Sequence, residues 1–176
     1  MREVIGNMWD MVDDYDAIVI TTNGYVKGNG EAVMGRGCAL EAANRHRELP
    51  GLLGRALTAH GNHCHRFDFP DISLVTFPVK PQSMYLFGAA HIKSYVVGYK
   101  QASIRPPCNV SGWMLKAQLP LIDRSAKELV EIVDNAGWEK VLLPRPGCGA
   151  GELDWPTVRS YLEPILDYRF TVATFR

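Results

Sequence analysis

Residues 17–45 read AIVITTNGYVKGNGEAVMGRGCALEAANR and contain, in order, a strand, a glycine-rich loop and a helix. Ala17–Thr21 is a continuous apolar and β-branched run, which predicts a strand buried on both faces at the centre of a parallel or mixed sheet. The loop at 23–37 is rich in glycine, and Cys38–Arg45 has the composition of a helix. Such a loop presents backbone N–H groups and the positive end of the helix dipole to a phosphate.

The same arrangement recurs near the other end of the chain. Lys140–Leu143 predicts a strand, Pro144–Gly151 a second glycine loop, and Asp154 the N-cap of a further helix. In an open α/β sheet the ligand crevice lies beyond the carboxyl ends of the strands, so two such loops would suit a diphosphate. Neither loop has the spacing of a P-loop or of a dinucleotide-binding fingerprint.

The remaining segments alternate between strands and helices, which makes α/β the predicted fold class. Helices are expected from Pro50 and from Leu121 to Gly137, and a polar loop is expected at 61–71. The alternation suggests one domain over 1–176, with an insertion at about 84–116 on one edge. The other strands are predicted at 3–5, 73–77 (ending before Pro78), 84–87, 95–97 and 170–175.

Composition excludes several classes of protein. The 176 residues include 19 Lys+Arg and 19 Asp+Glu, and 47% are hydrophobic, which predicts a folded chain with a sizeable core. No apolar run is long enough to cross a bilayer, so we expect no membrane association and a cytoplasmic location. Zero net charge weighs against tight, sequence-independent binding to duplex nucleic acid. The cysteines are too widely spaced for a disulfide framework, which predicts free thiols.

Charge is nevertheless unevenly distributed along the chain. The window between Asp71 and Asp123 contains no acidic residue. Either this segment meets an anionic partner, or its cations pair with acids elsewhere after folding. Aromatic residues interleaved with these cations could stack on a nucleotide or single strand, or form a small core under the insertion. The residues concerned are Lys80, Tyr85, Lys93, Tyr95, Tyr99, Lys100, Arg105, Trp113 and Lys116.

Four short motifs in this order carry a resemblance to a known family. They are Ile20-Thr21-Thr22-Asn23, Val33-Met34-Gly35-Arg36-Gly37-Cys38-Ala39-Leu40, Phe77-Pro78-Val79-Lys80 and Pro144-Arg145-Pro146-Gly147-Cys148-Gly149-Ala150-Gly151-Glu152-Leu153-Asp154-Trp155. Together they resemble the macrodomains, which bind ADP-ribose. The similarity is greatest to the branch with terminal ADP-ribose protein glycohydrolase and the antitoxin macrodomains that remove ADP-ribose from DNA. It covers 1–83 and 117–176, and implies a three-layer α/β/α sandwich with a mixed central sheet.

The resemblance also implies roles for particular residues. Asn23 would orient the distal ribose, and Lys80 would attack its anomeric carbon; contact with a ligand phosphate is the alternative role for Lys80. Backbone of the first loop would lie along the diphosphate and distal ribose, and the second loop would cradle the phosphates. The implied loop residues are Met34, Gly35, Arg36, Gly37, Gly147, Cys148, Gly149, Ala150 and Gly151. No cofactor or metal is implied, although His63-Cys64-His65 could supply ligands.

Three departures from the family pattern affect these roles. Asn7 stands where many macrodomains have the aspartate that recognises adenine, which questions adenine selectivity. Gly151 stands where the terminal glycohydrolases have an acid, although related antitoxin macrodomains also have glycine there. Glu152 could replace that acid, whereas Asp154 is better explained as a helix cap. The first loop is also longer than in the similar branch.

The implied activity is hydrolysis of ADP-ribose from a modified macromolecule, either protein or nucleic acid. A non-catalytic module that binds ADP-ribose or a related nucleotide is an alternative, as is a phosphatase acting on the 1″-phosphate of ADP-ribose. The sequence does not indicate an oligomeric state.

Overall fold

The computed structural model describes residues 1–96 and 104–174 and is built on a central sheet. Within these residues the sheet has six strands in the order β1-β8-β7-β2-β4-β3, in which all neighbours are parallel except β3 and β4. The mixed sheet predicted from the sequence is therefore confirmed. The strands are β1 (Arg2–Ile5), β2 (Ala17–Asn23), β3 (Arg66–Asp68), β4 (Ser73–Lys80), β7 (Val141–Pro144) and β8 (Phe170–Thr174).

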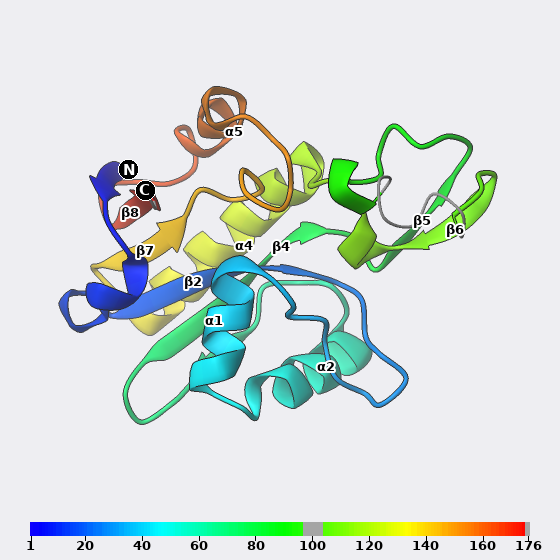
Figure 1. The fold of residues 1–176 in the computed structure, drawn as a ribbon. Coiled ribbons are helices and arrows are strands. Elements are labelled where there is room, and N and C mark those ends of the chain that lie inside the picture. The colour runs from blue at the N-terminus through cyan, green and yellow to red at the C-terminus, as the bar shows by residue number, and fades with distance from the viewer. Residues whose placement is uncertain (97–103, 175–176) are drawn as a thin grey trace.

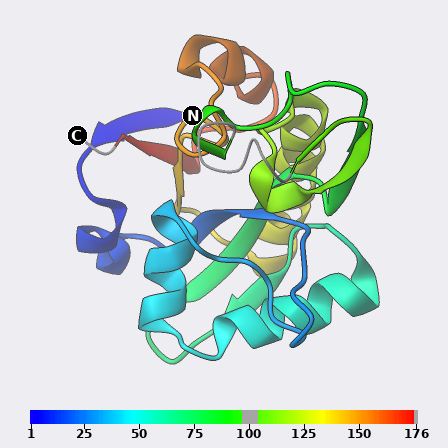
Figure 2. The same cartoon turned by 45° about the vertical axis from the view of Figure 1, so that its right-hand side comes forward.

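Helices cover both faces of this sheet (Figures 1 and 2). One face packs on α1 and α2, and the other on α4 and α5, each through its own buried apolar cluster. Ile18 and Ile20 belong to the first cluster and Val19 to the second, so consecutive side chains of β2 alternate between two cores. The helices are α1 (Gly37–Arg45), α2 (Leu49–His60), α4 (Leu119–Ala136) and α5 (Trp155–Leu162), with 3-10 turns η1 (Met8–Asp10), η2 (Val12–Asp14) and η3 (Gly112–Met114).

Several helix boundaries follow the predicted signals. Asp154 Oδ2 accepts a hydrogen bond from the Thr157 backbone N–H at 2.9 Å and so caps α5. Gly137 follows α4 with φ of 68°, the left-handed conformation that glycine adopts most readily at a helix end. No helix in the described part of the chain is both long and apolar enough to cross a bilayer.

Two predictions about the central sheet were wrong. The segment 61–71 is not all loop, because β3 pairs antiparallel with β4 through a register of Phe67 with Leu74. β4 also does not stop before Pro78 but runs to Lys80. The Thr76 N–H donates to the His65 carbonyl on the β3 side of the strand. Pro78 lies two residues further on, so its backbone nitrogen faces the same side, but β3 does not extend that far. The N–H that proline lacks therefore costs the sheet no hydrogen bond.

The insertion forms a small arm beside the main sheet (Figure 1). Its antiparallel strands β5 (Ser83–Leu86) and β6 (Cys108–Ser111) pack on a third, smaller apolar cluster that includes Leu115. The strand predicted at 95–97 is wrong for its first two residues, since residues 94–96 are helical, and Val97 lies outside the described residues. Tyr99, Lys100 and Phe175 lie outside them too.

Candidate functional site

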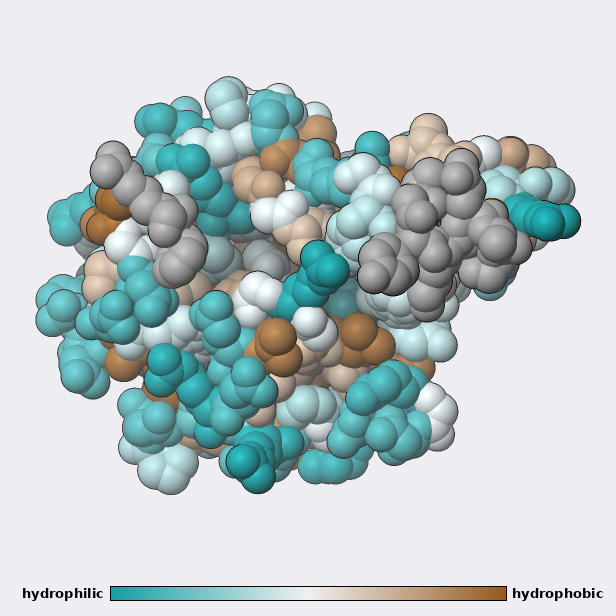
Figure 3. Space-filling view, viewed as in Figure 1, coloured by the Kyte–Doolittle hydropathy of each residue, from teal (hydrophilic) through white to brown (hydrophobic). Residues whose placement is uncertain are grey.

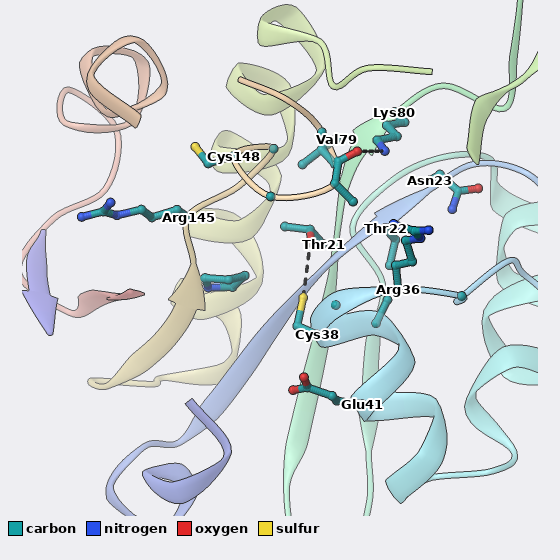
Figure 4. Close-up of a pocket in the computed structure, with 18 of the residues that line it drawn as sticks. Thr21, Thr22, Asn23, Arg36, Cys38, Glu41, Val79, Lys80, Arg145 and Cys148 are labelled. Atoms are coloured by element: carbon teal, nitrogen blue, oxygen red, sulfur yellow. Dashed lines mark hydrogen bonds between the residues drawn. The ribbon is translucent and has the colours of Figure 1, made fainter. Parts of the chain in front are cut away.

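A cavity of about 990 Å³ crosses the carboxyl ends of the five parallel strands (Figure 4). It begins beside Asn7 after β1 and ends beside Lys80 at the end of β4. Four inter-strand spacings separate these strands, so the cavity extends over roughly 19 Å. In the space-filling view (Figure 3), hydrophobic residues gather near the centre of the face shown, among hydrophilic ones. The shape suits an elongated ligand.

Backbone of both glycine loops lines the middle of this cavity. Gly35 and Gly37 come from the first loop, and Gly149 from the second. A Cβ at any of these three would have no neighbour within 4 Å, so the backbone is open to a ligand. The first-turn N–H groups of α1 point to the same space and carry the positive end of the helix dipole. The two loops therefore converge on one cavity, as the sequence predicted.

Lys80 lies at the far end of the cavity and is 7% exposed. Its Nζ donates a hydrogen bond to the Ala150 carbonyl oxygen at 2.7 Å, which joins β4 to the second loop. Burial, and then the charge and contact of Lys93, lower the pKa of Lys80 to about 7. A substantial fraction of this amine is therefore uncharged at neutral pH.

Asn23 lines the cavity through a side chain that also organises the first loop. Its Nδ2 donates to the Val33 carbonyl at 2.9 Å, and its Oδ1 accepts from the Tyr25 N–H at 3.0 Å. These bonds fix the end of β2 against the loop and set the orientation of the amide. Asn7, at the opposite end, caps η1 by accepting from the Trp9 N–H at 3.1 Å.

Two predicted site residues lie outside the lining of this cavity. Met34 is 6% exposed and packs into the apolar cluster beneath α1 and α2, because alternate residues of the loop face inward. Glu152, with φ of 60°, accepts hydrogen bonds from the Ser94 backbone N–H at 2.8 Å and hydroxyl at 2.6 Å. Burial raises the pKa of Glu152, but these bonds and the charges of Lys116 and Lys80 outweigh it and lower the pKa overall. Its carboxylate anchors the insertion to the second loop.

The cavity also contains residues that the sequence did not single out. Glu41 is the one carboxylate among the described lining residues, and lies on α1 one turn after Gly37. Helical periodicity from Gly37 could have placed it there. The Arg145 guanidinium points away from the cavity centre (Figure 4) and bonds to Glu3 at 3.2 Å. Cations exceed acids in the lining: Lys27, Arg36, Lys80, Lys93 and Arg145.

Neither cysteine of the cavity has the properties of a nucleophile. Burial raises the pKa of Cys148 to about 11, and burial also raises the pKa of Cys38, which lies 3.4 Å from the Thr21 hydroxyl. Both therefore remain neutral thiols at neutral pH. All four cysteines of the chain are free, as predicted.

The insertion supplies one wall at the Lys80 end. Lys93, Tyr95 and Trp113 line the cavity, and the Arg36 guanidinium carbon lies 4.0 Å from the Tyr95 ring centroid. This contact joins the first loop to the insertion. The interpretation as a small core holds for Tyr95, which packs against the apolar cluster of the insertion, whereas Tyr85 is exposed. Stacking of these aromatics on a nucleotide stays a prediction.

The fold and this cavity define a class of α/β proteins in which the parallel strands of a mixed sheet end at one extended cavity. Within that class the chain has the macrodomain fold. No protein-family model and no curated protein matches the sequence, so the comparison rests on solved structures.

Three of these structures align over nearly the whole chain. The macrodomain of Mycobacterium tuberculosis DarG has a TM-score of 0.65 at 20% identity, over 97% of this chain and 96% of its own. That of Thermus aquaticus DarG has a TM-score of 0.68 at 19% identity, over 99% and 97%. Thermosipho africanus DarTG, solved in complex with ADP-ribose, has a TM-score of 0.69 at 13% identity, over 99% of this chain and 42% of its own. At these identities the likeness establishes the fold.

Proposed function

We propose that this chain is an ADP-ribosyl hydrolase that removes ADP-ribose from a modified protein or nucleic acid, with Lys80 as the nucleophile. The observation that carries the proposal is a buried lysine with a pKa of about 7 at one end of an elongated, cation-rich cavity. An ordinary lysine is almost fully protonated at neutral pH and has no lone pair to offer. A structural relative, Thermosipho africanus DarTG, was solved in complex with ADP-ribose, which supports the choice of ligand.

The dimensions of the cavity suggest how ADP-ribose would lie in it. The diphosphate would lie between the two glycine loops, where unpaired amides and the N-terminus of α1 attract negative charge. The distal ribose would then reach Asn23 and Lys80, and the adenine would reach Asn7 at the opposite end. Glu41 lines the cavity as well and could accept a hydrogen bond from the adenine amino group.

The proposed chemistry has two halves. The uncharged Nζ of Lys80 forms a bond to the anomeric carbon of the distal ribose as the bond from that carbon to the carrier breaks, and the electron pair leaves with the carrier. Opening of the sugar ring converts the adduct to a Schiff base and its conjugate acid. Water then adds to the same carbon, the carbon–nitrogen bond breaks, and ADP-ribose and the free lysine are regenerated. Protons lost by Nζ and gained by the carrier pass through solvent.

The proposal can be tested with ADP-ribose itself. The free sugar is in equilibrium with an aldehyde, so sodium cyanoborohydride should trap it on Lys80 as a stable amine that mass spectrometry locates. Lys80→Ala should remove the adduct and yet still bind ADP-ribose by calorimetry, with NAD and AMP as comparison ligands. Lys127, an exposed lysine on α4 paired with Asp123, is the internal control for random labelling. Equal labelling of Lys80 and Lys127 would refute the nucleophile.

A non-catalytic ADP-ribose-binding module is the second candidate function. The observation that favours it is the position of Glu152, which is bonded to Ser94 and lies outside the cavity lining, so no described carboxylate lines the Lys80 end. A hydrolase would release ADP-ribose from modified peptides or oligonucleotides and lose this turnover in Lys80→Ala. A binding module would leave the modified peptides and oligonucleotides uncleaved, both as the parent protein and as Lys80→Ala.

A further inference from the structure

Lys93 is a buried lysine from the insertion that lines the same cavity as Lys80. It is only 3% exposed. Lysine is almost never buried to this degree without a compensating partner, because removing an ammonium group from water is costly. Its position therefore requires an explanation beyond packing.

The partners of Lys93 stabilise its charge without neutralising it. Nζ donates a hydrogen bond to the Tyr95 hydroxyl, lies 4.6 Å from the centroid of the Tyr95 ring, and lies 6.0 Å from that of Trp113. A hydroxyl lone pair and the negative faces of two rings attract an ammonium group. Among the described residues, no carboxylate forms a salt bridge with either Lys93 or Lys80. The positive field of Lys93 therefore acts on Lys80, opposed in part by the charge of Glu152.

The backbone around Lys93 holds it in this place. The Lys93 N–H donates to the Met114 carbonyl at 3.0 Å, and the Lys93 carbonyl accepts from the Val96 N–H at 3.0 Å. The next residue, Ser94, is bonded to Glu152 of the second loop. The insertion is thus fastened to the loop whose Ala150 carbonyl accepts from Lys80. The second loop therefore helps to hold both lysines, Lys80 through Ala150 and Lys93 through the bond between Ser94 and Glu152.

We propose that Lys93 is a positioning residue that acts through Lys80, its ammonium group holding the neighbouring amine in the uncharged, nucleophilic form. This role rests on the proposed function and extends it, because it assigns the insertion a part in the reaction. Several groups from the surrounding elements act on the pKa of Lys80. Burial comes first, Lys93 and Arg36 also lower the pKa of Lys80, and Glu152 opposes them.

The decisive measurement reads the protonation of Lys80 directly and requires no turnover. The intact protein, free of ligand, is treated with a trace of acetic anhydride across pH 5–10, and acetylation of Lys80 is followed by mass spectrometry. In the parent protein the midpoint is expected near the pKa of about 7. Lys93→Met should raise it by about one pH unit, the scale typical of a nearby like charge. Lys93→Arg should keep it near the parent value, and Lys127→Met serves as the remote control.

The outcomes separate this proposal from the one on which it rests. An unmoved Lys80 midpoint in Lys93→Met would overturn the role of Lys93, and would leave a hydrolase with a lysine tuned by burial alone. If the midpoint rises but cyanoborohydride never traps ADP-ribose on Lys80, the coupling between the two lysines stands and the proposed hydrolase mechanism is refuted. If Lys93→Met fails to fold, Lys93→Gln is read in the same assay. If Lys93 only binds a phosphate of the ligand, Lys93→Met should bind ADP-ribose more weakly while the Lys80 midpoint stays at the parent value.

Discussion

Gly151 shows how one position without a side chain shapes the site. A Cβ there would lie 2.3 Å from the Gly147 carbonyl oxygen and 2.7 Å from the Ala117 Cβ. Any side chain at this position, including the acid that the resemblance to the terminal glycohydrolases implies there, would require the loop backbone to move. The sequence indicates the departure, but only the folded loop shows its steric cause.

We expect Gly151→Ala to lower the free energy of unfolding by about 1–3 kcal/mol or more, because the loop backbone must move to admit the methyl group. Gly149→Ala is the matched control, since nothing lies within 4 Å of its Cβ position. Urea denaturation of the two variants compares them directly. Equal stabilities would mean that the loop relaxes at no cost.

Burial of Lys80 carries a cost to stability whose pH dependence can be derived. The unfolded chain holds the lysine proton up to about pH 10.5, whereas the folded protein releases it near pH 7. Between these values the unfolded state binds more protons, so this group's contribution to the free energy of unfolding rises with pH. At about 1.4 kcal/mol for each pH unit between the two values, the cost approaches about 5 kcal/mol below pH 7.

Lys80→Met should therefore be more stable than the parent protein at pH 6, and the advantage should shrink as the pH approaches 10. The same variant should not form the adduct that cyanoborohydride traps. Urea unfolding at pH 6, 8 and 10 provides the measurement, with exposed Lys127→Met expected to stay within about 0.5 kcal/mol of the parent throughout. A constant difference across this range would contradict the lowered pKa.

At the scale of elements, local patterns predicted most of the fold and failed where tertiary contacts decide. The apolar run of β2 and the caps of α4 and α5 are local signals, and they placed these elements correctly. β4 continues through Pro78 because its ladder partner β3 has already ended, a fact about a distant segment. The polar strand β3 has no pattern of its own and exists through its pairing with β4.

The link between α4 and β4 provides a test at this scale. Ser125 is fully buried, and its hydroxyl donates to the Pro78 carbonyl at 2.7 Å, two residues before Lys80. Ser125→Ala leaves that carbonyl without this partner and should cost about 1–3 kcal/mol in urea unfolding. Ser160→Ala removes an exposed hydroxyl of α5 bonded to Thr157 and should cost less than about 0.5 kcal/mol. Equal unfolding free energies for the two variants would show that the bond from Ser125 to Pro78 does not stabilise the fold.

At the scale of the whole molecule, the site depends on a strand order that sequence patterns do not encode. The motifs and the resemblance predicted that the two loops, Lys80 and Asn7 would share one site, but not that the end of β8 would line the same cavity. The insertion was predicted as an edge feature, and its contribution of Lys93 to the site depends on long-range bonds such as that between Ser94 and Glu152.

The insertion should open more readily than the main sheet, because its apolar cluster is small and separate from the other two. Native-state hydrogen exchange should give β5 and β6 amides a lower opening free energy than those of β2. Leu115→Ala should lower the opening free energy of the β5 and β6 amides further and leave that of β2 unchanged. Added ADP-ribose should raise the opening free energy of the insertion, since Lys93, Tyr95 and Trp113 line the cavity. Identical protection in both sheets would show that they unfold as one unit.

The neighbouring positions of β1 and β8 have a consequence for how the protein is made. In the described sheet, β1 is an edge strand whose one neighbour is β8, and β8 lies between β1 and β7. β1 and β8 are far apart in the sequence. Of the described strands, β1 is synthesised first and β8 last, so β1 has no strand partner until residues 170–174 have been made. Ligand affinity should therefore appear only after β8 has been made, and a nascent chain arrested before Phe170 should lack it.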